Sequence, residues 1–236
     1  MRTFTFVALS LALITGCSSP AEEDDLTASE PLIAGSVAEV AANSGCDSSG
    51  VHGISQQLVL VEMKCVAPNT FLSFAPHAGI SMTGSNVYPS LVAPAHDAVQ
   101  RAGDAAHAAG SAIEINSAFR TLAQQYVLYH SGACGTAAKP SRSNHESGKA
   151  VDVANFDEAS GWLERAGCAH HAYPGDPYHF DCPGNDFRGD SVLTFQKLWN
   201  ANHPEDRIAE DGSYGSQTDR RLGRSPAKGF ATTPCQ

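Results

Sequence analysis

The sequence predicts an α+β fold in which helices flank a small antiparallel sheet, followed by a small helical segment at the C-terminal end. Short segments with the composition of strands occur at residues 112–116, 150–154 and 178–182. An alanine-rich helical pattern at 90–110 precedes them. A last stretch, 190–200, has apolar residues at helical spacing.

The elements before the first of these strands look structural. Residues 55–66 fit either a helix or a strand, and 71–74 fit a short strand. The segment 90–110 fits a helix, because Pro94 lies in its first turn and Gly110 follows its end.

A strand followed by a helix comes next. Residues 112–116 alternate apolar and polar side chains, and Thr121 is a good N-cap for a helix to about His130. Arg120 then lies at the turn between them. It makes either a surface salt bridge or a contact to negative charge in a cleft, such as a carboxylate or the oxyanion of a tetrahedral intermediate. Gln125, about one helical turn later, is expected to face the same side as Arg120.

Metal-ligand chemistry is concentrated after this helix. His145 and Asp152 lie in the run 143–152, and His179 follows in the last predicted strand. An aspartate inside a buried strand is costly unless it is paired or binds metal. Two imidazoles and one carboxylate leave a fourth tetrahedral position open, as in catalytic rather than structural zinc sites. We therefore expect one zinc ion per chain.

Composition bounds the partners and the domain count. The chain has 236 residues, 42% of them hydrophobic, which suits one medium domain and a small one. We place these at 36–185 and 186–236. The formal charge of −10 argues against nucleic acid, whose phosphates require a basic face.

The N-terminus is typical of an exported lipoprotein. Residues 1–16 combine Arg2 with an apolar run too short to span a bilayer, and end in a lipobox-like Leu-Ile-Thr-Gly before Cys17. Lipidation of Cys17 would anchor the chain to a membrane, with 17–35 as an acidic disordered tether and the protein facing the periplasm or cell envelope. The alternative is an ordinary secretion signal cut nearby. The choice between inner and outer membrane stays open.

Six further cysteines suggest up to three disulfides in an exported chain. Cys46 and Cys65 would close a short loop, and Cys168 and Cys182 flank a predicted strand pair. Pairing of Cys134 with Cys235 follows only by elimination.

Three motifs in order give the chain a family resemblance. Residues 143–152 resemble the Ser-x-His-x-x-Gly-x-Ala-x-Asp signature of the zinc D-alanyl-D-alanine carboxypeptidases. VanY-type enzymes share this signature, and they belong to a wider group that includes the hedgehog domain. Ser-Ala-Phe-Arg-Thr at 117–121 resembles the family's Ser-Gly-Tyr-Arg-Ser. Asp-Pro-Tyr-His at 176–179 resembles its Glu-x-Trp-His, with aspartate in place of the commoner glutamate.

The resemblance implies a hedgehog/D,D-peptidase-like fold and a role for each motif residue. His145, Asp152 and His179 would hold zinc, whose bound water becomes the nucleophile. Asp176 would be the general base. Arg120 would steady the oxyanion or a substrate carboxylate, with Gln125 and Ser143 assisting.

The implied activity is hydrolysis of D-alanyl bonds in peptidoglycan stem peptides by a monomeric enzyme. An L,D-carboxypeptidase or a stem-peptide endopeptidase is the alternative enzyme. The alternative of another class is a non-catalytic, zinc-containing lipoprotein that binds the cell wall.

The C-terminal segment has a resemblance of its own. Phe-Gln-x-x-x-Asn at 195–200 and Asp-Gly-x-Tyr-Gly at 211–215, followed by Thr218, are similar to motifs of small peptidoglycan-binding domains. The alternative is a helical extension that packs on the catalytic part and has no affinity for the wall.

Overall fold

The computed structural model describes residues 33–84, 86–171 and 176–235. Helices surround a five-stranded and a two-stranded sheet, so the predicted α+β class is confirmed. The predicted signal peptide, Cys17 and nearly all of the tether lie outside the described residues.

The larger sheet carries the strands predicted from sequence. Its order is β2-β4-β5-β7-β6. The strands are β2 Ile80–Met82, β4 Ile113–Ser117, β5 Ala150–Val153, β7 His179–Asp181 and β6 Ala169–His170. Strands β2 and β4 pair in parallel and the other neighbours are antiparallel, so a purely antiparallel sheet was wrong for this one pair. Ile113 and Ile115 are buried while Glu114 between them is exposed, as the alternation predicted.

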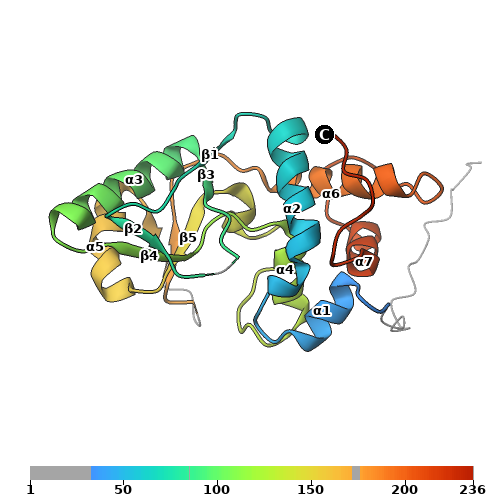
Figure 1. Ribbon diagram of the computed structural model, residues 1–236, viewed down its shortest axis with the longest axis horizontal. Coiled ribbons are helices and arrows are strands. Elements are labelled where there is room, and N and C mark those ends of the chain that lie inside the picture. Colours follow the sequence, from blue (N-terminus) through green and yellow to red (C-terminus); the bar gives the residue numbers. More distant parts are fainter. Residues whose placement is uncertain (1–32, 85, 172–175, 236) are drawn as a thin grey trace, which may run out of the picture. The chain divides into compact units, whose positions relative to one another are not determined.

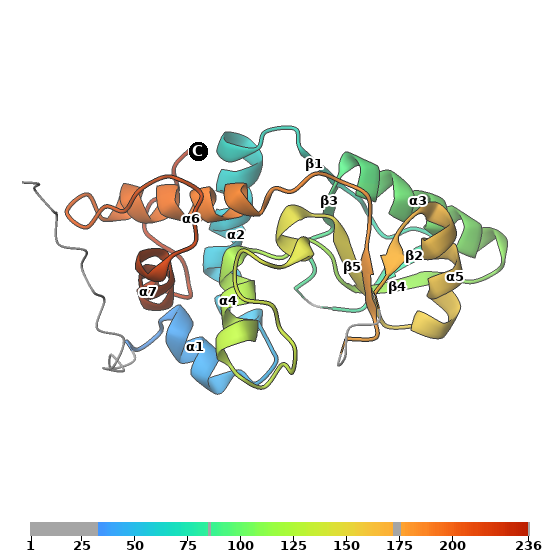
Figure 2. The same ribbon diagram turned by 180° about the vertical axis from the view of Figure 1, so that it is seen from behind.

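Two helices pack beside this sheet, α3 Ala93–Ala108 and α5 Phe156–Ala166 (Figures 1 and 2). Their apolar faces and the strands form one core that includes Val99, Leu163 and Phe180. The helix predicted to begin at residue 90 begins at Ala93, because Ser90–Val92 is strand β3 and pairs with β1, Phe71–Ser73.

A second core lies among five helices. They are α1 Val37–Asn43, α2 His52–Val61, α4 Leu122–His130, α6 Arg188–Asn202 and α7 Ser216–Arg224. Short 3₁₀ turns lie at Ser49–Val51 and at Asn144–Ser147, which is η3. A π-helical turn lies at Glu62–Val66. Thr121 caps α4 as predicted, accepting a hydrogen bond from the Gln124 amide. The C-terminal helices α6 and α7 thus share one core with the N-terminal helices α1, α2 and α4. The division into a catalytic domain that ends at residue 185 and a wall-binding segment that begins at 186 remains a prediction.

The disulfides correct the expected pairing. The structure joins Cys168 to Cys182, as predicted, but Cys46 to Cys134 and Cys65 to Cys235. Because α1 packs on α4, the loops that follow these two helices meet, which brings Cys46 to Cys134. Proximity in sequence was a poor guide, since these two bridges close 88- and 170-residue separations.

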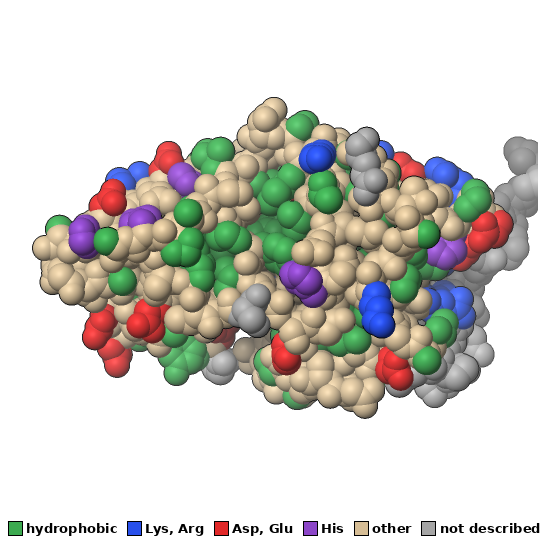
Figure 3. Space-filling model, viewed as in Figure 1, with side chains coloured by type: hydrophobic (Ala, Val, Ile, Leu, Met, Phe, Trp, Pro, Cys, Tyr) green, Lys and Arg blue, Asp and Glu red, His purple; other side chains and the backbone are tan. Residues whose placement is uncertain are grey.

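In the described part of the chain, no helix is both long enough and apolar enough to cross a membrane. The face seen in Figure 3 carries scattered acidic and basic side chains, with apolar side chains exposed near its middle.

Candidate metal centre and its cleft

Three predicted ligands come together on the sheet. Asp152 on β5 lies directly opposite His179 on β7 in the antiparallel register, so both side chains share one face. His145 reaches them from η3. Asp152 Oδ1 lies 3.1 Å from His145 Nε2 and 3.0 Å from His179 Nδ1, and the two nitrogens are 3.2 Å apart.

These distances fit a tetrahedral cation. Zinc bonds of about 2.0–2.1 Å at tetrahedral angles place neighbouring ligand atoms about 3.3 Å apart. The three atoms therefore match one face of such a tetrahedron and leave its fourth corner free. Among the described residues, these three are the group of His, Cys, Asp or Glu side chains that could hold a metal. A set of two imidazoles and one carboxylate suits zinc.

Hydrogen bonds behind the imidazoles orient them for a metal. His145 Nδ1 lies 2.7 Å from the Ala118 carbonyl oxygen, and His179 Nε2 lies 2.9 Å from Asp181 Oδ1. Each contact places the ring proton away from the centre and leaves the other nitrogen's lone pair to a cation. Asn144 Nδ2 in turn donates to Asp181 Oδ1 over 2.7 Å.

Sequence reasoning missed Asp181 and Asn144. Strand periodicity could have found Asp181, since residues two apart in a strand point to the same face and His179 was already a predicted ligand. Asn144 had no signal of this kind.

Hydrogen bonds at the ends of the short turn η3 set the position of His145. The Ser143 hydroxyl accepts from the His145 amide over 3.3 Å, and the buried Glu146 carboxylate accepts from the Ser143 amide over 3.2 Å. Gly148 ends the turn at φ +61°, where a Cβ would lie 2.6 Å from the Phe71 ring. Ser143 and Gly148 therefore fix where His145 points.

Burial and charge set the protonation of the ligands. Burial lowers the pKa of His145, and the Arg120 charge lowers it further. Burial alone would raise the pKa of Asp152, but His145, His179 and Arg120 outweigh it and hold that pKa well below its usual range. Burial opposes protonation of His179, yet hydrogen bonds to Asp152 and Asp181 raise its pKa to about 9. The centre thus contains a fixed anion that attracts positive charge.

Arg120 is positioned against the metal centre. Its Nη2 donates to Asp152 Oδ2 over 3.1 Å and to Ser117 Oγ over 3.0 Å. Its Nη1 donates to Gln125 Oε1 over 3.0 Å, while Gln125 Nε2 donates to the Ala138 carbonyl. Gln125 is fully buried and lies behind Arg120, so its place is that of a support for the arginine and the 131–142 loop.

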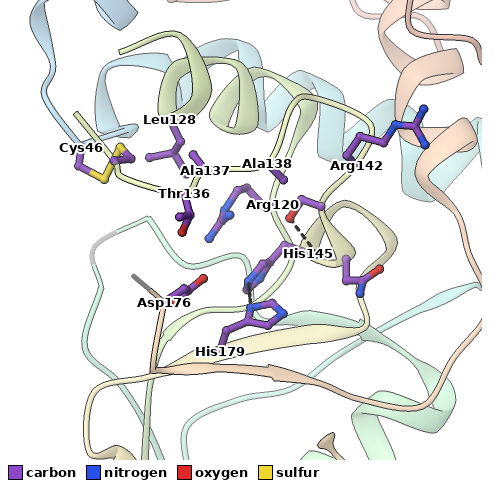
Figure 4. A pocket seen from close by; sticks show the side chains of 13 residues that line it. Cys46, Arg120, Leu128, Thr136, Ala137, Ala138, Arg142, His145, Asp176 and His179 are labelled. Carbon is purple, nitrogen blue, oxygen red and sulfur yellow. Dashed lines mark hydrogen bonds between the residues drawn. A yellow bond between two sulfur atoms is a disulfide. The ribbon is translucent and has the colours of Figure 1, made fainter. Parts of the chain in front are cut away.

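A cleft of about 520 Å³ opens onto this centre. Arg120, Ser143, His145, Asp176 and His179 line it, together with the loop around Thr136 and the Cys46–Cys134 disulfide. Figure 4 shows Arg120, Asp176 and the two imidazoles converging on the same space. Asp176 is half-buried, and burial, followed by the Asp152 charge, raises the pKa of its carboxyl. The candidate centre therefore has a carboxyl group beside it in the same cleft.

Comparison with known families agrees with this geometry. Residues 89–174 match the model of the VanY family, described as D-alanyl-D-alanine carboxypeptidase. The matched segment contains Arg120, Ser143, His145 and Asp152 and ends just before Asp176. No curated protein matches the chain. Residues 89–174 are therefore similar to the D-alanyl-D-alanine carboxypeptidase domain of the VanY family.

Proposed function

We propose that the protein is a zinc-dependent peptidase that hydrolyses the terminal D-alanyl bond of peptidoglycan stem peptides. The observation that carries this proposal is the close approach of three donor atoms, two of them on imidazoles that line a cleft, with the Asp176 carboxyl group lining the same cleft. His145, Asp152 and His179 would hold the ion. When bound, zinc would polarise the scissile carbonyl and lower the pKa of a water molecule.

Asp176 is the residue proposed to move protons. A carboxyl with a raised pKa is a better proton acceptor at neutral pH than an ordinary aspartate. It would take a proton from the attacking water and deliver it to the leaving amine. The side chain of Asp176 is one methylene shorter than the glutamate that the resembling family more commonly has at this position of its Glu-x-Trp-His motif.

Arg120 and Ser143 are the residues proposed to contact substrate. Both line the cleft beside the imidazoles. Since Asp152, Ser117 and Gln125 hold the guanidinium in place, its charge is preorganised for the oxyanion or for the substrate's terminal carboxylate. Gln125 would act through Arg120.

We also propose that the protein is exported and works as a monomer, anchored through lipidated Cys17. A peptidase acting on stem peptides must reach the cell wall, and the lipobox-like sequence supplies a means to do so. Mass spectrometry of the mature N-terminus would reveal a diacylated or triacylated Cys17, and an unmodified N-terminus elsewhere would contradict it.

The test of the peptidase is the Asp176→Ala variant. With a stem pentapeptide ending in D-Ala-D-Ala, we expect release of D-alanine to fall by about 10²–10⁴-fold, the usual contribution of a general base. Zinc content should stay at that of the wild type, since Asp176 is not a ligand.

The matched control is Asp157→Ala on the exposed start of α5. It should keep the wild-type rate. Full activity in Asp176→Ala would refute the assigned base, and an inactive wild type that still binds zinc would favour a non-catalytic wall-binding protein.

A further inference from the structure

A second hollow adjoins the cleft. It has a volume of about 430 Å³, and Arg142 lines both it and the cleft. Consecutive residues of one loop form the boundary, with Ala138 on the cleft side and Lys139 to Ser141 on the side of the hollow. Figure 4 shows the Arg142 side chain pointing away from the two imidazoles. A ligand that extends from the metal centre past Ser143 would therefore reach this hollow.

The far wall of the hollow comes from the C-terminal segment, at Gly212, Ser213 and Tyr214. These residues belong to the motif that resembles peptidoglycan-binding domains. Gln196 holds their loop, because its amide donates to Asp211 Oδ1 over 2.9 Å and accepts from the Gly212 amide over 2.9 Å.

Two further contacts hold this wall in place. Gly212 has φ +68°, and a Cβ there would lie 2.9 Å from the Gly189 carbonyl oxygen. The Tyr214 hydroxyl donates to Asp219 over 2.6 Å. The motif residues Gln196, Asp211 and Tyr214 therefore make internal bonds that shape a wall of the hollow.

The charge of the hollow contrasts with that of the chain, which carries a formal −10. Lys139, Arg142 and Arg188 line it with one acid, Asp186. Asp186 is already paired with Arg188 through two carboxylate oxygens. The charged groups of Lys139 and Arg142 are exposed and make no hydrogen bond or ion pair with the described residues. The Lys139 charge acts on the Asp219 carboxylate, which is already bonded to His130 and Tyr214. Two cations are thus available to an anionic ligand.

We infer that this hollow is a distal substrate subsite, in which Lys139 and Arg142 bind a carboxylate that lies upstream of the scissile bond. The inference rests on the proposed function and deepens it. Stem peptides carry such a carboxylate on a γ-linked D-glutamate, and a guanidinium is suited to binding it through two hydrogen bonds. The C-terminal segment then contributes to substrate selection as part of the catalytic groove.

The test compares two pentapeptides, L-Ala-γ-D-Glu-L-Lys-D-Ala-D-Ala and the same peptide with the glutamate α-carboxyl converted to an amide. For the wild type, we expect kcat/KM to favour the acid by about tenfold, as one charge-assisted contact provides. In the double variant Lys139→Gln, Arg142→Gln the preference should fall to about one. Arg165→Gln, an exposed arginine on α5, should keep it.

Equal rates on both peptides with the wild type would overturn the inference, as would an unchanged preference in the double variant. An equal loss of kcat/KM on both peptides in the double variant leaves the preference unchanged, so this outcome would also overturn the inference.

Binding separates this inference from the proposed function. Calorimetry with the tripeptide L-Ala-γ-D-Glu-L-Lys and its amide uses the full chain and needs no hydrolysis. Suppose that the wild type cleaves neither pentapeptide but binds the acid tripeptide about tenfold more tightly than the amide, and that the double variant binds both equally. That result would support the subsite and refute the proposed peptidase activity. Equal binding of acid and amide refutes the subsite.

Discussion

Arg120 and Asp152 form an ion pair of 3.1 Å at the candidate metal centre. The pair divides the Asp152 carboxylate, because Oδ2 accepts from Arg120 while Oδ1 faces the two imidazole nitrogens. Arg120 comes from the turn after β4 and Asp152 from the neighbouring strand β5. The ion pair therefore joins the residue proposed to contact substrate to a residue proposed to hold zinc.

The first prediction concerns Arg120→Lys. An ammonium cannot reproduce the fork that contacts Ser117, Gln125 and Asp152 together. We expect kcat/KM for the pentapeptide to fall by about 10²–10³-fold, as for loss of an oxyanion donor, with one zinc retained per chain. Steady-state kinetics and metal analysis on the same sample check this. A variant that loses zinc in proportion to activity would assign Arg120 to the metal centre alone.

A second prediction concerns Asp181→Asn. The substitution keeps an acceptor for His179 Nε2 but removes the charge that makes this imidazole a stronger ligand. We expect zinc affinity to weaken by about 10–100-fold, measured by titration against a competing chelator.

Asp97→Asn is its control, since Asp97 is exposed on α3 and pairs with the adjacent His96. Unchanged affinity in Asp181→Asn would show that the carboxylate does not tune the metal centre.

Glu62 supplies a prediction about pH and stability. Its side chain is 1% exposed, and Oε1 has no hydrogen-bond partner in the described part of the chain. Burial, followed by the charges of Asp190 and Glu146, raises its pKa well above the usual range. The folded state therefore binds a proton that the unfolded state has released above about pH 4.3, and this group lowers the free energy of unfolding as pH rises.

Glu62→Gln removes that proton uptake. We expect the variant to gain stability relative to the wild type between pH 5 and pH 8, by at most about 1.4 kcal/mol per pH unit. Urea unfolding at both pH values measures the difference, with the exposed Glu164→Gln as the control. If the stability of Glu62→Gln relative to the wild type decreased as pH rises, the prediction would be wrong.

Local signals predicted much of the site. His145 and Asp152 lie seven residues apart, so a turn and a strand could be expected to bring them together. Thr121 was a visible N-cap, and it begins α4 directly after Arg120. Such features depend on hydrogen bonds and spacing within a few residues, which the sequence displays.

Long-range packing determined the rest. Cys46 pairs with Cys134 because α1 lies on α4, and nothing near either cysteine indicates that contact. Ser90–Val92 joins a strand because β1 lies beside it, against the helical pattern that follows. Gln125 was expected at the substrate, but its burial and its bonds to Arg120 and Ala138 place it behind the site.

The central claim is that His145, Asp152 and His179 hold a zinc ion on which peptide hydrolysis depends. The most direct measurement follows zinc content and D-alanine release in one sample during removal of metal by a chelator and its return. We predict that both quantities fall together and recover together at one zinc per chain. Full hydrolysis by protein stripped of metal would contradict the account.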